Sequence, residues 1–142
     1  MKQTVNIDLQ KQKEAEHRKI VEEYFRLIGQ QKFNEGLKFF APDCKTHNPY
    51  FSGNMETLTN AMAKVSKEMT GKASNAEFAV KHILADGDLV AAYTQLIGNR
   101  LKPSEGGLRQ VHLFRFESSK IAEYWDVTQQ LTPEMPNAAG AF

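Results

Sequence analysis

One histidine and one aspartate, His112 and Asp126, stand among aromatic residues in the stretch 108–130, LRQVHLFRFESSKIAEYWDVTQQ. The stretch predicts two β-strands around a Glu-Ser-Ser-Lys turn, because apolar residues alternate with polar ones on both sides of it. Ionisable groups on an aromatic strand surface need a partner or a chemical task, since an unpaired buried charge is unfavourable. A carboxyl group beside apolar side chains can both take and give a proton near neutral pH. The hairpin is therefore a candidate acid/base site if its register brings the two side chains to one face.

The length of the turn decides whether the two side chains meet. If Ser118, Ser119 and Lys120 form a three-residue loop, His112 lies directly opposite Asp126. If Ser118 and Ser119 alone form the loop, every cross-strand partner slips by one residue, and Asp126 leaves the face that carries His112. The residues of the hairpin leave both registers open.

The elements that must position this hairpin come in a simple order, with helices first and strands after. Apolar residues at helical spacing predict three helices, and alternation between turn signals predicts a four-strand antiparallel meander. The helices are expected over about 8–28, 34–41 and 54–71, a loop over 42–53, and the first two strands over about 76–85 and 89–99. This order is typical of an α+β domain whose sheet curls around the helices and leaves a pocket at its open end.

Both faces of the last hairpin are substantially apolar, whereas a sheet with one wet face should be polar on that side. In the register with the three-residue loop, His112, Tyr124 and Asp126 share one face, and Ile121 and Trp125 lie on the other. We expect the first face to line the pocket and the second to pack against another copy of the chain. The sequence therefore predicts a homodimer that binds a small, mostly apolar molecule.

Composition narrows the class of protein. The chain has 142 residues, a formal charge of +1, 41% hydrophobic and 25% charged residues, which is typical of one globular domain. We expect a single domain over 1–142, with 1–7 and 131–142 as terminal arms. No basic stripe predicts nucleic-acid binding, and no apolar run is long enough for a membrane span. The lone Cys44 fits a reducing cytoplasm. The four histidines are scattered and predict no metal site, and no glycine-rich phosphate loop is present.

Three motifs resemble those of the SnoaL-like polyketide cyclases, which belong to the nuclear-transport-factor-2-like superfamily. They are THNPYFSG (46–53), VHLFRFESSKIAEYWDV (111–127) and NAAGAF (137–142), within a resemblance that covers about 20–142. The resemblance implies a cone-shaped α+β barrel with a deep apolar cavity, usually dimeric and working without metal or organic cofactor. It also implies that Asp126 is the general acid/base of an aldol-type ring closure, with His112 beside it.

Four other residues are candidates for contact with substrate. An amide at a cavity mouth could hydrogen-bond a carbonyl or enolate oxygen, which makes Asn48 a candidate together with its neighbour His47. Tyr24 lies on the apolar side of the first helix, and Tyr124 shares a face with Asp126.

Two functions remain open from the sequence. The first is an enzyme that carries out aldol cyclisation, dehydration or isomerisation through an enolate, with Asp126 as acid/base and His112 orienting it. The alternative is a non-catalytic ligand-binding or dimerisation module that uses the same cavity.

Overall fold

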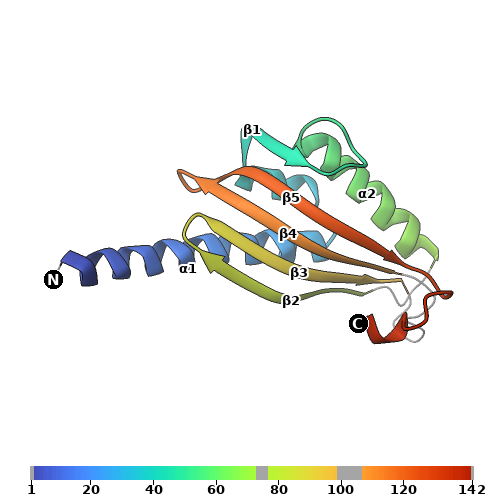
Figure 1. The fold of residues 1–142 in the computed structure, drawn as a ribbon. Helices are drawn as coiled ribbons and strands as arrows, with labels where there is room; N and C mark the ends of the chain where they lie inside the picture. Colours follow the sequence, from blue (N-terminus) through green and yellow to red (C-terminus); the bar gives the residue numbers. More distant parts are fainter. Residues whose placement is uncertain (1, 73–76, 99–106, 142) are drawn as a thin grey trace.

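The computed structural model of the protein describes residues 2–72, 77–98 and 107–141. A long helix is followed by a curled five-stranded sheet with strand order β1-β5-β4-β3-β2 (Figure 1). The elements are α1 (Lys2–Gly29), the 3-10 helix η1 (Asn34–Phe39), β1 (Phe40–His47), α2 (Met55–Lys72), β2 (Glu77–Asp86), β3 (Leu89–Ile97), β4 (Gly107–Glu117), β5 (Lys120–Leu131) and a C-terminal 3-10 turn η3 (Ala139–Ala141). The predicted α+β class with a curled sheet is confirmed.

Helix α1 is longer than predicted. It begins at Lys2 instead of about Asp8, so the residues expected as an N-terminal arm are its first turns. Figure 1 shows this N-terminal half of the helix projecting beyond the sheet. The cap of α2 is as predicted, because the side-chain oxygen of Asn54 accepts a hydrogen bond from the Thr57 backbone N–H at 3.1 Å. The predicted end of the second strand, at Asn99, lies outside the described residues.

Strand β1 replaces the first part of the loop expected over 42–53, and that expectation is wrong. We expect the second helix to end before Pro42 and the loop to begin there. The strand is an edge strand, paired in parallel with β5, and its register is irregular between Phe40 and Lys45. Proline is tolerated at such edges and irregularities. The extra strand brings His47 and the following Asn48 next to the end of β5.

The hairpin of β4 and β5 turns through two residues, the shorter of the two loops that the sequence left open. Ser118 and Ser119 have left-handed φ angles of 49° and 65°, as a tight two-residue turn requires. Glu117 pairs with Lys120, and the ladder then shifts by one residue at a bulge around Ala122. The bulge restores the register that the longer loop would have produced.

As a result, His112 lies directly opposite Asp126 in the ladder, which is one of the two pairings that the sequence left open. The bulge also turns Ile121 into the core, where it is fully buried; we had expected it on the opposite face. Trp125 stays on that opposite, outer face of the sheet, stacked on His47.

The core fills the space between the inner face of the sheet and α1. The ring of Phe114 in the hairpin packs against Tyr24 and Phe25 of the helix at centroid separations of 5.9 and 5.8 Å. It also packs against Tyr124 of the hairpin at 5.3 Å. Such edge and tilted ring contacts add to the stabilisation from buried area.

Polar contacts hold α1 against the two hairpin turns. His17 is buried, stacks on Phe116 at 4.2 Å and donates from Nδ1 to the Gly87 carbonyl at 3.1 Å. Glu14 accepts from the Gly87 backbone N–H at 3.1 Å. The helix is thereby fixed in position along the sheet. None of the helices within the described residues is long and apolar enough to cross a membrane.

Candidate functional site

A cavity of about 160 Å³ opens between the inner face of the sheet, the end of α1 and helix α2. Its walls are mostly apolar, and side chains such as Ile28, Leu58 and Met62 contribute to them. Its polar lining residues are Asn48, Tyr50, Ser66, Gln110, Asp126 and Thr128. The cavity therefore joins one carboxyl group to a space suited to an apolar molecule.

Asp126 is held by one amide. Asn48 donates from Nδ2 to both carboxylate oxygens, Oδ1 and Oδ2, each at 2.9 Å. The amide is fixed in turn, because its oxygen accepts from the Tyr50 backbone N–H at 2.8 Å. Asp126 itself is 7% exposed. Asn48 thus orients the carboxylate from the loop after β1, and its N–H groups are occupied there instead of pointing at a substrate oxygen as we expected.

His112 lies behind Asp126 and is bonded to other groups. Its Nδ1 is 2.7 Å from the Tyr124 hydroxyl, and its Nε2 is 2.8 Å from the Thr94 hydroxyl. We expected this histidine to orient Asp126, but Asn48 makes that bond. Burial lowers the pKa of His112 to about 3, so the imidazole is neutral at physiological pH. A neutral imidazole donates from one nitrogen and accepts at the other. One of the two hydroxyls, of Thr94 or Tyr124, therefore donates to the ring, and the other accepts from it.

Both candidate tyrosines lie in the core next to the carboxylate and outside the described lining of the cavity. Burial raises the pKa of Tyr124 well above its usual range, and the nearby Tyr24 and Asp126 raise it further. Burial and then the charge of Asp126 likewise raise the pKa of Tyr24. The two hydroxyls therefore keep their protons and lie in the core beside Asp126. The expected contact of these tyrosines with ligand has no support in this arrangement.

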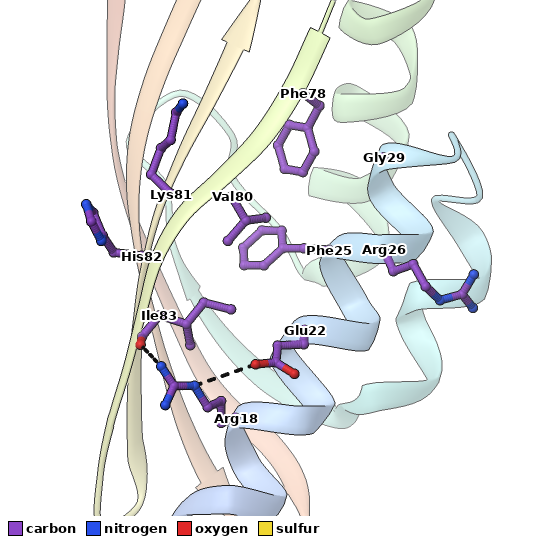
Figure 2. A pocket seen from close by; sticks show the side chains of 10 residues that line it. All are labelled: Arg18, Glu22, Phe25, Arg26, Gly29, Phe78, Val80, Lys81, His82 and Ile83. Atoms are coloured by element: carbon purple, nitrogen blue, oxygen red, sulfur yellow. Dashed lines mark hydrogen bonds and ion pairs between the residues drawn. The ribbon is translucent and has the colours of Figure 1, made fainter. Parts of the chain in front are cut away.

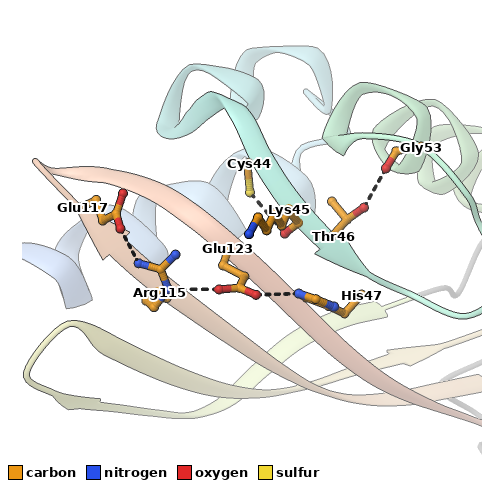
Figure 3. Close-up of polar contacts among 8 residues, drawn as sticks. All are labelled: Cys44, Lys45, Thr46, His47, Gly53, Arg115, Glu117 and Glu123. Carbon is orange, nitrogen blue, oxygen red and sulfur yellow. Dashed lines mark hydrogen bonds and ion pairs between the residues drawn. The ribbon is translucent and has the colours of Figure 1, made fainter.

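His47 points away from the cavity, onto the outer face of the sheet (Figure 3). Its Nε2 lies 2.7 Å from Glu123, and its ring stacks on Trp125 at 4.9 Å. Its bond to Glu123, and then that from Arg115, lower the pKa of this carboxylate. His47 is the last residue of β1 and faces outward, whereas Asn48 begins the following loop and faces Asp126. The predicted role of His47 in binding substrate is not supported by its position.

Gln110 and Thr128 line the cavity and were not among the predicted site residues. Alternation along the strands would have found them, because they lie two positions from His112 and Asp126 and so share their face. Gln110 donates from Nε2 to the Thr128 hydroxyl oxygen at 2.9 Å.

A second, larger hollow of about 490 Å³ lies between α1 and the edge strand β2 (Figure 2). Its two arginines are already engaged: Arg18 bonds the Ile83 carbonyl and lies 3.6 Å from Glu22, while Arg26 bonds Glu23. The hollow is wide open and lies at the edge of the sheet, away from Asp126. We therefore place the candidate site in the smaller cavity, which holds Asp126.

Metal ligands do not gather at either place. Within the described residues, no three His, Cys, Asp or Glu side chains lie close enough together to hold a metal ion. Among the described residues of its lining, the cavity offers one group for acid/base chemistry, the fixed carboxylate of Asp126. The hydrogen-bond network of His112 beside it is neutral and buried. Such a carboxylate can accept a proton from an apolar ligand and return it.

The chain matches the model of the SnoaL-like domain over residues 21–124. Solved structures similar to it include a putative hydroxylase, AclR, from Streptomyces galilaeus (18% identity, 82% of this chain and 90% of that chain, TM-score 0.65). They also include an NTF2-like protein of unknown function from Cytophaga hutchinsonii (15%, 80% and 89%, 0.60) and a putative ketosteroid isomerase from Kribbella flavida (14%, 90% and 88%, 0.59). Among curated proteins, none matches the chain.

Proposed function

Because the chain belongs to the SnoaL-like domain family, we propose that it is an enzyme acting on a small, mostly apolar carbonyl compound through an enolate. Asp126 is its general acid/base. The observation that carries the proposal is the carboxylate of Asp126 at an apolar cavity, with both oxygens fixed by Asn48. Fixing the reacting group in advance lowers the entropic barrier to proton transfer.

The proposed step is removal of a proton from the carbon next to the carbonyl. An oxygen of Asp126 takes the proton, the C–H electron pair becomes the new C=C bond, and the carbonyl oxygen gains the negative charge. Protonation of one carboxylate oxygen weakens its bond from Asn48, and the released N–H can then turn to the enolate oxygen. Return of the proton to another carbon or to an alkoxide completes isomerisation or aldol closure, and loss of water completes dehydration.

The supporting network lies behind the carboxylate. Neutral His112 and the protonated hydroxyl of Tyr124 form a fixed polar backing next to Asp126. Their hydrogen bonds end inside the core, so they keep the surroundings of Asp126 in place, while Asn48 orients the carboxylate itself. The putative ketosteroid isomerase among the similar structures agrees with proton transfer next to a carbonyl, though its 14% identity supports the fold alone.

Hydrogen exchange tests the proposal without a known substrate. The protein is incubated in deuterium oxide with a panel of small enolisable ketones, and loss of the protons next to the carbonyl is followed by NMR. Wild-type protein should accelerate exchange, and Asp126→Asn should slow it at least about 100-fold, the low end of general acid/base contributions. A folded Asp126→Asn variant that exchanges protons as fast as wild type overturns the assignment. Binding of ketones by wild type without any exchange favours the ligand-binding module instead.

A further inference from the structure

A polar pair beside Asp126 gives the cavity a second, chemically distinct subsite. Gln110 and Thr128 face each other across β4 and β5, two residues along from His112 and Asp126. Both side chains line the cavity, and Gln110 Nε2 donates to Thr128 Oγ1 at 2.9 Å. Two residues of strand correspond to roughly 7 Å, so this pair contacts a different part of a ligand from the part that faces Asp126.

The pair offers one donor and one acceptor. The Thr128 oxygen accepts from Gln110 and keeps its own hydrogen to donate, while the side-chain oxygen of Gln110 is an acceptor. A ligand hydroxyl both donates and accepts, so it satisfies both groups at once. The subsite is therefore matched to a hydroxyl group.

Charge excludes an acidic group at the same place. Of the described residues that line the cavity, Asp126 alone carries a charge, and that charge is negative. A ligand carboxylate would meet no cation there and would be repelled by Asp126, and one hydroxyl donor would not replace the hydration that it loses. The ligand should be neutral.

Volume sets the size of the ligand. The cavity measures about 160 Å³, and an apolar cavity of about 150 Å³ is known to hold benzene. The enclosed part of a ligand is thus about one ring. A fused polycyclic compound would extend well beyond the cavity.

We propose that the cavity selects a neutral hydroxy-carbonyl compound of about one ring, with its hydroxyl group bound by Gln110 and Thr128. The position of the carbonyl, at Asp126, rests on the proposed function. The hydroxyl subsite and the preference for a neutral ligand rest on the lining of the cavity.

Three matched probes test the selection: acetophenone, 4-hydroxyacetophenone and 4-acetylbenzoate. Their dissociation constants are measured at pH 7 by calorimetry or ligand-observed NMR. Wild type should bind 4-hydroxyacetophenone roughly five-fold or more tightly than acetophenone, the factor that one net hydrogen bond supplies. It should bind 4-acetylbenzoate more weakly than acetophenone. Equal affinities, preferred binding of the carboxylate, or binding of none of the three overturns the proposal.

Two variants assign the preference to the subsite. Thr128→Val and Gln110→Leu should each lower the preference for the hydroxyl to about two-fold or less, while affinity for acetophenone shows that the cavity has kept its shape. A preference that survives both substitutions also overturns the proposal. Exchange of the methyl protons of the same probes for deuterium reports on Asp126 separately. Selective binding without exchange defeats the proposed function alone, and exchange without selectivity defeats the hydroxyl subsite alone.

Discussion

The side-chain nitrogen of Asn48 lies 2.9 Å from each of the two carboxylate oxygens of Asp126. The two residues are far apart in the sequence, and they meet because the edge strand β1 runs parallel to β5. The Asn48 oxygen is bound to the Tyr50 backbone, so the loop after β1 sets the direction of the carboxylate. A change in the loop after β1 should therefore change the orientation of the Asp126 carboxylate.

This arrangement predicts a loss of activity in Asn48→Ala. Without the amide, Asp126 can rotate away from the ligand, and misplacement of a reacting group by about 1 Å can slow a reaction 100-fold. We expect ketone proton exchange to fall about 10- to 100-fold, with unchanged circular dichroism. His47→Ala is the matched control, since the neighbouring side chain faces the outer surface; its rate should stay within about two-fold. Equal losses in the two variants would contradict the role given to Asn48.

The buried imidazole predicts how stability depends on pH. The pKa of His112 is about 3 in the folded protein and 6.5 for an unperturbed histidine, so the unfolded chain takes up a proton first as pH falls. Its contribution to stability is complete above about pH 6.5 and decreases as pH falls toward 3. The free energy of unfolding should drop by up to about 1.4 kcal/mol per pH unit from this residue.

His112→Gln provides the comparison, because glutamine can donate and accept without titrating. Urea unfolding of both proteins at pH 7.5, 6 and 5 gives two slopes against pH, and the wild-type slope should be the steeper. Parallel slopes would mean that the imidazole is not held neutral. All other titrating groups are shared by the two proteins, so they cancel in the difference.

Much of the fold and part of the site could be read from the sequence. Periodicity located the long helix and the meander, and alternation placed His112 and Asp126 on one face in one of the two registers left open. The bulge at Ala122 could not be predicted, because a bulge and a longer turn produce the same pairing and differ only in where the extra residue lies. The side chains of Asn48 and His47 were assigned together because their segment was expected to be a loop. In the structure, β1 ends at His47 with its side chain facing outward, and the loop that begins at Asn48 directs the amide to Asp126.

The tight turn itself predicts a stabilising substitution. Ser119 adopts a φ of 65°, a conformation that costs a residue with a Cβ roughly 1 kcal/mol and glycine very little. Ser119→Gly should therefore raise the free energy of unfolding by about 1 kcal/mol in chemical denaturation. Ser119→Ala is the control. It also loses the exposed hydrogen bond from the Ser119 hydroxyl to Glu16, but alanine keeps the Cβ that disfavours a positive φ. A glycine variant no more stable than the alanine variant would contradict the strain in this turn.

The outer face of the sheet predicts self-association. Val127 and Leu84 are 72% and 70% exposed there, and Val111, paired with Val127 across the ladder, is 50% exposed. Exposed aliphatic side chains grouped on a flat strand surface are unfavourable in water, and the same group on a second copy would cover them. We expect a dimer through this face, detectable by sedimentation velocity over a range of protein concentrations.

Val127→Glu should shift that dimer toward monomer, because two-fold packing would place the introduced charges in an apolar interface. Leu9→Glu is matched in chemistry and exposure, with Leu9 58% exposed on α1, and it should leave the dimer intact. If Leu9→Glu dissociates the protein and Val127→Glu does not, the interface lies on the projecting helix and the outer sheet face is free. A wild-type monomer at every concentration would remove the dimer altogether. The acid/base site would be unaffected by either result, since Asp126 and its cavity lie on the opposite face of the sheet.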